Sequence, residues 1–280
     1  MKNKIFLSLL VLATGLTGLN IAGLFTSLRN DEIYSVKDKH WDAECPSGIS
    51  LTEDQFHSGL DKIFTDKTLN DSAKVTQTCD LVERGLVHYW LDDKRKEYNL
   101  TIPVYENYIL WGMQFIYPLM FEKYQLLDWR KTIQRGVAIC SQSAIAVSEI
   151  LNEKGVESQI VKLNGHVVAR AKISNNRHFI IDPDFGVTLP YDIDEIQNNV
   201  ELIRPYYQAK ICDESDMHRL IDVYNPDGNK IVRNAAVYME GYGTFGEIAY
   251  QLTWIIPLLL LLPFVIINTK RLLTKLKTRI

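Results

Sequence analysis

Three residues near the middle of the chain have the types and the order of a nucleophile, its base and an orienting acid. Cys140 begins a helical pattern, His166 begins a strand pattern, and Asp182 ends the next strand pattern directly before a proline. A thiol attacks carbonyl carbons when an imidazole takes its proton and a carboxylate holds that imidazole in place. Each residue alone also fits a structural role: a buried cysteine, a polar turn residue and an acid at a strand end. Together, at the ends of three elements, they predict a cysteine active site.

The helix that begins at Cys140 is predicted from apolar spacing. Cys140, Ala144, Val147 and Leu151 share one helical face, and Gly155 is typical of a helix end. Unpaired N–H groups and the helix dipole favour negative charge in the first turn, which promotes the thiolate of a cysteine there.

Two strands are expected to bring His166 and Asp182 together. The strand that starts at His166 and the strand that ends at Asp182 are separated by the turn residues 174–176. With a three-residue loop, Asp182 falls opposite Val168, and His166 and Asp182 become diagonal neighbours roughly 7–8 Å apart on one face. A two-residue loop would place them on opposite faces, so this prediction depends on the register.

The local sequences are Gly-Val-Ala-Ile-Cys (136–140), Asn-Gly-His-Val-Val (164–168) and Phe-Ile-Ile-Asp-Pro-Asp-Phe-Gly (179–186). In this order they resemble the transglutaminase-like superfamily, whose members are related to papain in fold. The resemblance covers residues 129–188, about a fifth of the chain. It implies an α+β, papain-like/transglutaminase-like domain with a helical N-terminal part and a nucleophile helix packed on an antiparallel sheet. The residues flanking the cysteine and the histidine depart from many members, so the resemblance bears on the triad more than on a substrate.

The resemblance implies that Cys140 is the nucleophile, His166 its base and Asp182 the residue that orients the imidazole. Such a set forms a thioester from an amide or ester, which water or an amine then resolves. The backbone N–H of Cys140 is one expected oxyanion donor. Gln134 is the candidate for the second, because papain-like enzymes place a glutamine at a similar spacing, and Trp129 is a weaker candidate. Hydrolysis is favoured over amine transfer, which needs a dedicated acceptor pocket.

His178 is a rival base, because it lies at an even spacing from Asp182 on the same predicted strand, but no glycine precedes it. The remaining histidines show no metal-ligand spacing, and the chain has no Gly-rich phosphate loop. The sequence therefore predicts no metal and no cofactor.

Two uncharged segments, residues 5–28 and 248–269, are each long enough to cross a hydrocarbon layer of about 30 Å. Lysines precede the first and a basic tail follows the second, which predicts that both termini are cytoplasmic. The first segment could alternatively be a cleaved signal peptide. The predicted organisation is a cytoplasmic start (1–4), a signal-anchor helix (5–28), an extracytoplasmic domain (29–247), a second transmembrane helix (248–269) and a cytoplasmic basic tail (270–280).

Residues 29–247 hold all 34 acidic residues and all but seven of the 31 basic ones, a formal charge of 24 − 34 = −10 that argues against nucleic acid. The expected partners are the membrane and a protein, peptide or envelope-linked amide substrate at the outer face of a bacterial-type plasma membrane. The alternative function is a non-catalytic binding module in a cell-envelope or surface-polysaccharide assembly.

Three further expectations concern the domain interior. Thr52 and Gln55 predict a helix-capping box, and Cys79 lies on a predicted buried helical stripe. Cys45, Cys79 and Cys212 allow two alternatives: one disulfide with one cysteine left over, or three free thiols. The uncharged segment 108–121 is too short to cross a membrane, and a buried helix is favoured over an element on the bilayer surface.

Overall fold

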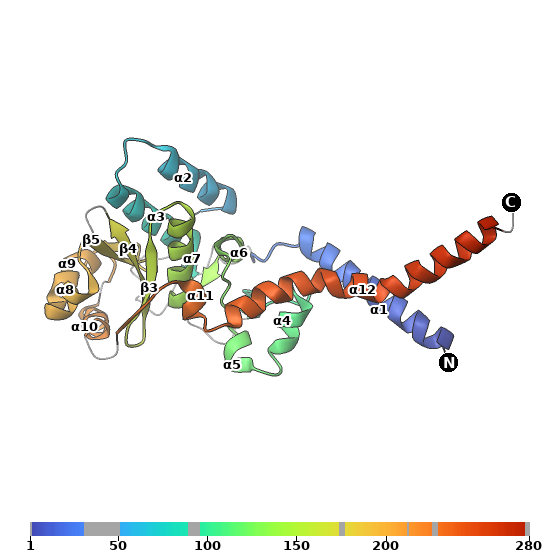
Figure 1. Ribbon diagram of the computed structural model, residues 1–280. Helices are drawn as coiled ribbons and strands as arrows, with labels where there is room; N and C mark the ends of the chain where they lie inside the picture. Colours follow the sequence, from blue (N-terminus) through green and yellow to red (C-terminus); the bar gives the residue numbers. More distant parts are fainter. Residues whose placement is uncertain are drawn as a thin grey trace. The chain divides into compact units, whose positions relative to one another are not determined.

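The computed structural model describes residues 2–30, 51–88, 96–173, 177–211, 213–225 and 229–277. It is an α+β structure with a long apolar helix near each end (Figure 1). The chain divides into two compact units. The first comprises Met1–Ser27, Thr101–Glu122 and Thr244–Ile280, and the second comprises Leu28–Leu100 and Lys123–Gly243.

The second unit is built on a five-stranded sheet that is antiparallel throughout, in the order β6-β5-β4-β3-β7. A separate two-residue parallel pair, β1-β2, lies outside this sheet. The strands are β1 (Val87–His88), β2 (Val137–Ala138), β3 (Ser158–Lys162), β4 (Val167–Ile173), β5 (Arg177–Asp182), β6 (Val187–Leu189) and β7 (Lys230–Val232).

Both faces of the sheet are buried, because side chains alternate along each strand. Ala169 and Ile181 pack into a core with the first group of helices, whereas Val168 and Ile180 pack into a core with the second. The first group is α2 (Glu53–Thr65), α3 (Asp71–Gly85), α6 (Trp129–Arg135) and α7 (Cys140–Glu153). The second is α8 (Ile193–Asn198), η2 (Val200–Ile203), α9 (Arg204–Tyr207) and α10 (Glu214–Val223). Helix α11 (Ala235–Tyr238) packs beside β3 and β7.

The local predictions for α2, α3 and α7 are confirmed. Ala144, Val147 and Leu151 are fully buried on α7. The helix ends where expected, since Gly155 has a φ of 86°. The capping box at the start of α2 is present, and Cys79 of α3 is fully buried.

Cys79 and Cys140 are both free thiols. Cys45 and Cys212 lie outside the described residues, and so does any bridge between them.

The hairpin of β4 and β5 has the register of the predicted three-residue loop. Ile173 pairs with Arg177, and Ala169 pairs with Ile181. One further step along this ladder brings Asp182 opposite Val168. The turn residues 174–176 themselves lie outside the described residues.

The first unit contains two helices that are long and apolar enough to cross a membrane, judged by length and composition: Lys4–Phe25 and Tyr242–Lys270. They belong to α1 (Lys2–Phe25) and α12 (Tyr242–Lys277). The two helices run antiparallel. Phe6, near the start of α1, contacts Phe264, whereas Asn20, further along α1, donates to the carbonyl of Thr253, which comes earlier in α12.

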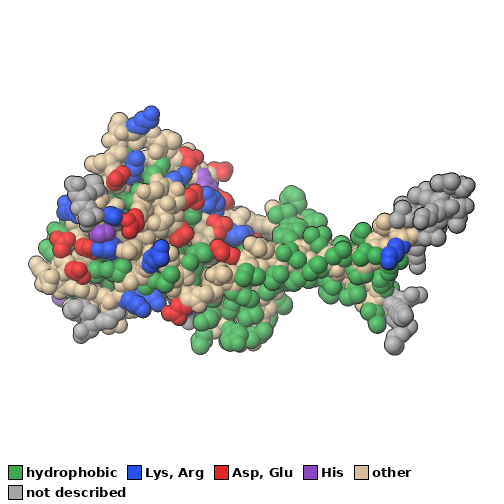
Figure 2. Space-filling model, viewed as in Figure 1, with side chains coloured by type: hydrophobic (Ala, Val, Ile, Leu, Met, Phe, Trp, Pro, Cys, Tyr) green, Lys and Arg blue, Asp and Glu red, His purple; other side chains and the backbone are tan. Residues whose placement is uncertain are grey.

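The prediction that segment 108–121 is a buried helix is wrong. The segment instead forms two short helices, α4 (Tyr108–Met113) and α5 (Pro118–Phe121), whose apolar side chains are largely exposed (Figure 2). Leu119 is 100% exposed and Phe115 67% exposed. Pro118 lacks the N–H needed to continue a helix through this stretch. By its contacts the segment groups with α1 and α12, not with the sheet.

Candidate functional site

Cys140 is the first residue of α7 and is partly exposed. Helix α6 stops just before it, because Gly136 adopts a left-handed conformation with a φ of 73°. Ile139 takes the N-cap position and has no side-chain acceptor for the first-turn N–H groups. The thiol therefore lies among helix-start N–H groups that no capping side chain satisfies, as the sequence predicted.

His166 lies directly before β4 and is held there by the preceding turn. Gly165 has a φ of 92°, and the backbone N–H of Leu163 donates to the carbonyl of His166 at 2.9 Å. The imidazole Nε2 lies 2.9 Å from Oδ2 of Asp182, and both side chains are buried. The predicted meeting of this histidine and this aspartate is thus present in the structure.

The thiol and a second carboxylate complete the cluster. One donor atom each from Cys140, His166 and Asp184 lies within 4.8 Å of the other two, and Nδ1 of His166 is 3.9 Å from Oδ2 of Asp184. Asp184 was not predicted as a site residue. The sequence offered a signal for it, since it follows Asp182 at an interval of two residues.

Two buried tyrosines form a hydrogen-bonded chain that ends at Asp182. The hydroxyl of Tyr207 on α9 donates to Oδ2 of Asp182 at 2.7 Å, and it lies 2.8 Å from the hydroxyl of Tyr224. The backbone N–H of Asp184 donates to the other oxygen, Oδ1, at 3.2 Å. Burial, with the nearby charge of Asp182, raises the pKa values of Tyr207 and Tyr224. Both tyrosines therefore stay neutral and available as donors.

The electrostatics of the cluster favour a protonated imidazole. Burial by itself disfavours the charged ring and lowers its pKa. The negative charge of Asp182 and the hydrogen bond to it outweigh burial, with smaller contributions from Cys140 and Asp184, so the pKa of His166 stands well above its ordinary value.

Cys140, His166 and Asp184 together are also the donors that could hold a metal ion. A thiolate, an imidazole and a carboxylate are a set that suits Zn²⁺. Such an ion would be coordinated by the sulfur of Cys140, which would then not be free to act as a nucleophile. No metal-ligand spacing was visible in the sequence because the three residues come from three different elements.

The two candidates for a second oxyanion donor are placed differently. The indole N–H of Trp129 donates to Glu153 at 2.9 Å. Glu153 ends α7, thirteen residues and about 20 Å from Cys140. Trp129 is therefore not placed to donate at the thiol. Gln134 lies half-buried in the last turn of α6, and its role stays a prediction.

Helix α11 contributes a side chain that sequence reasoning missed. The hydroxyl of Tyr238 is within hydrogen-bonding reach of Ser141, so it lies near the start of α7. Burial raises the pKa of Tyr238, which therefore keeps its proton. It follows Cys140 by almost a hundred residues, and no local pattern connects the two.

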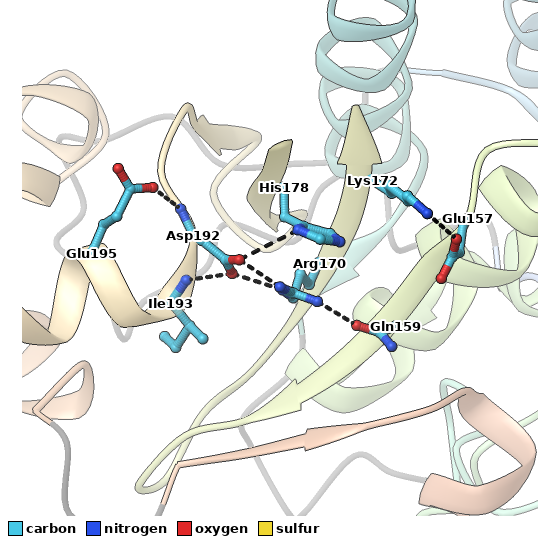
Figure 3. A network of polar contacts seen from close by, with 8 residues as sticks. All are labelled: Glu157, Gln159, Arg170, Lys172, His178, Asp192, Ile193 and Glu195. Atoms are coloured by element: carbon cyan, nitrogen blue, oxygen red, sulfur yellow. Dashed lines mark hydrogen bonds and ion pairs between the residues drawn. The ribbon is translucent and has the colours of Figure 1, made fainter. Parts of the chain in front are cut away.

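The rival base, His178, belongs to a different network (Figure 3). Its Nδ1 lies 3.4 Å from Oδ2 of Asp192, whose other oxygen accepts from Nε of Arg170 at 2.7 Å. Burial and the charge of Arg170 lower the pKa of His178. His178 lies four positions before Asp182 on β5, which is about 13 Å along the strand. His178 therefore does not compete for the same carboxylate.

No protein-family model, curated protein or solved structure matches this chain. What the fold and the site define is an α+β domain with a cysteine, histidine and aspartate cluster at the start of a central helix.

Proposed function

We propose that this chain is a membrane-anchored cysteine enzyme of the transglutaminase-like, papain-related class, which cleaves or transfers an amide-type bond on a substrate of the cell envelope. Cys140 is the nucleophile, His166 its proton acceptor and donor, and Asp182 the residue that orients the imidazole. The observation that carries this proposal is the buried 2.9 Å contact between His166 and Asp182 next to the thiol at the start of α7.

In the proposed mechanism the two imidazole nitrogens have different tasks. Nε2 faces Asp182, so Nδ1 is the nitrogen left to exchange a proton with the thiol. Because the pKa of His166 is raised, the ring keeps that proton at neutral pH. A cationic ring beside the sulfur favours the thiolate, which is the nucleophilic form.

The reaction then proceeds in two halves. The thiolate attacks the amide carbonyl carbon, the C–N bond breaks, and the imidazolium gives its proton to the departing amine, which leaves a thioester on Cys140. His166 next removes a proton from water, the resulting hydroxide attacks the thioester, and the C–S bond breaks, which releases a carboxylic acid and restores the thiolate beside the protonated His166. In this proposal the backbone N–H of Cys140 donates to the oxyanion of each tetrahedral intermediate. With an amine in place of water, the same steps transfer the acyl group.

The membrane part of the proposal is a two-pass topology with both termini in the cytoplasm and the sheet domain outside. Antiparallel packing of α1 and α12 supports it, because the two chain ends then lie on the same side of a bilayer. The basic residues at both ends assign that side to the cytoplasm. A compartment-sensitive reporter at Asn229 is expected to read outside, and one after Thr269 is expected to read inside. The opposite result at Asn229 contradicts this topology.

Thiol labelling tests the enzyme proposal. The full chain is treated in detergent with iodoacetamide at pH 6, and mass spectrometry follows each cysteine separately. Cys140 is expected to react much faster than Cys212, and His166→Ala is expected to slow Cys140 by roughly 10²-fold, the usual contribution of an acid–base residue. His178→Ala is the matched control and leaves the rate unchanged. Equal, slow labelling of Cys140 and Cys212 overturns the enzyme and favours a binding module.

A further inference from the structure

Residues 108–121 present an exposed apolar surface. Six large side chains within ten residues are exposed, and the most exposed of them lie between α4 and α5 and on α5. They are Trp111, Phe115, Ile116, Tyr117, Leu119 and Met120. A contiguous patch of this kind on a soluble protein marks an interaction site. Figure 2 shows hydrophobic side chains gathered over this part of the chain and along the long helices.

A hydrogen bond ties this segment to the long helices at a defined point. Pro257 has no N–H, so the carbonyl of Thr253, four residues earlier, has no helical partner. Asn20 Nδ2 on α1 donates to that carbonyl at 2.6 Å, and the hydroxyl of Tyr108 at the start of α4 donates to it at 3.0 Å. An unpaired carbonyl in hydrocarbon costs several kcal/mol, so this double acceptance suits a lipid environment.

Close packing between α1 and the turn just before the segment points the same way. A Cβ on Gly23 would clash with the carbonyl oxygen of Tyr105, so only glycine permits this approach. Small residues let neighbouring backbones approach closely inside membranes. Phe121 of α5 also stacks edge-on against Phe245 of α12, with ring centroids 5.9 Å apart.

The carbonyl of Thr253, which Asn20 and Tyr108 share, also indicates how deep the segment lies in the bilayer. Asn20 lies five residues before the end of α1 at Phe25, which is about 8 Å along the helix axis. Tyr108 bonds the same carbonyl as Asn20, so α4 begins near that level. Tryptophan and tyrosine side chains such as Trp111 and Tyr117 are enriched at this depth, where the hydrocarbon meets the headgroups.

The backbone of the segment can tolerate such a position. Between α4 and α5, the N–H groups of Phe115, Ile116 and Tyr117 donate to the carbonyls of Gly112 and Met113 at 2.8–3.2 Å. The next residue is Pro118, which has no N–H to satisfy. Non-helical backbone is costly in lipid only where its polar groups lack partners.

We propose that residues 108–121 form a third membrane element, which enters the bilayer interface from the side opposite the chain termini and does not cross. Its ligand is the lipid itself, with acyl chains against Phe115 and Leu119 and the headgroup region against Trp111. The inference is independent of the enzyme proposal and concerns only the first unit, which contains α1 and α12.

Tryptophan quenching by brominated lipid tests this inference. Three variants of the full chain each keep one tryptophan and carry phenylalanine at the other four positions. Trp111 reports on α4, Trp254 on α12, and Trp129, which is 5% exposed in the sheet domain, is the control. In phosphatidylcholine vesicles, bromines near the headgroup are expected to quench Trp111 as strongly as Trp254, and to leave Trp129 unchanged.

The possible outcomes distinguish this inference from two alternatives: a protein partner for the patch, and a chain whose long helices are not in lipid. If Trp254 is quenched and Trp111 behaves like Trp129, the helices are in lipid and residues 108–121 are not, which overturns the inference and favours a protein partner for the patch. If neither Trp111 nor Trp254 is quenched, membrane insertion of the first unit as a whole is refuted. Leu119→Glu, at a fully exposed position, is expected to reduce the quenching of Trp111 and to leave Cys140 labelling unchanged.

Discussion

Strand β5 contributes one residue to each of two histidine–aspartate pairs, and the electrostatics of the two pairs are opposite. His166 with Asp182 is buried, and its imidazole pKa is raised well above the ordinary value. His178 with Asp192 is more exposed, and its imidazole pKa is lowered. The two pairs contain the same chemical groups, so the difference must come from their surroundings.

The groups next to the two aspartates differ in charge. Asp192 accepts two hydrogen bonds from Arg170, which lower the pKa of that carboxyl in spite of its burial and leave little attraction for His178 (Figure 3). Asp182 has no guanidinium partner among the described residues and accepts from the neutral hydroxyl of Tyr207. Its charge therefore acts on His166, and a buried charge acts more strongly than an exposed one. Competition by an arginine is what makes one pair structural and leaves the other suited to chemistry.

The largest effect is expected from removing the charge of each aspartate in turn. Asp182→Asn keeps the shape of the side chain but lets burial dominate, so the pKa of His166 falls and Cys140 alkylation at pH 7 slows by roughly 10²-fold. Asp192→Asn is the matched control and leaves that rate unchanged. Equal rates in the two variants would remove the distinction between the pairs.

The protonation states of the two rings are expected to separate in a pH titration. NMR of histidine-labelled full chain in detergent should find His166 still protonated above pH ~6.5, the ordinary value, and His178 already neutral below it. His166 then contributes stability that is complete below about pH 6.5 and is lost as the pH rises through its folded pKa. His178 has the opposite sign, because its depressed pKa costs stability as the pH falls below about 6.5. Titration of both rings at one pH would contradict the comparison.

A smaller effect is expected when the support behind Asp182 is removed. Tyr207→Phe deletes one donor to a buried carboxylate and should lower the free energy of unfolding by about 1.5–3 kcal/mol, measured by guanidinium unfolding of the full chain in detergent. Tyr206→Phe, at the adjacent and partly exposed position, should change it by less than about 0.5 kcal/mol. Matching losses in the two variants would show that Asp182 does not depend on this hydroxyl.

The smallest effect is expected at the second pair. His178→Gln should change the free energy of unfolding by less than about 0.5 kcal/mol, because Arg170 remains to pair with Asp192. It should leave the labelling rate of Cys140 unaltered. A slower rate in this variant would return His178 to consideration as a base.

Local features of the site were predictable because their causes are local. The helical spacing of apolar residues predicted α7, and Gly155, which tolerates a positive φ, predicted where the helix ends. The hairpin register followed from one loop length, and it decided that His166 and Asp182 share a face. The residues around Cys140, His166 and Asp182 were not predictable. Tyr207, Tyr224 and Tyr238 come from helices far along the chain, and no local sequence pattern relates them to the site.

The sequence by itself determined where apolar residues concentrate, which residues can act as nucleophile, base and acid, and which strand positions lie on one face. The tertiary structure decided that His178 meets Asp192 and that Arg170 pairs with this acid. It also decided the place of residues 108–121, where the sequence favoured a protein core. An apolar pattern records only that a segment avoids water, and a protein interior and a lipid layer satisfy that requirement equally well.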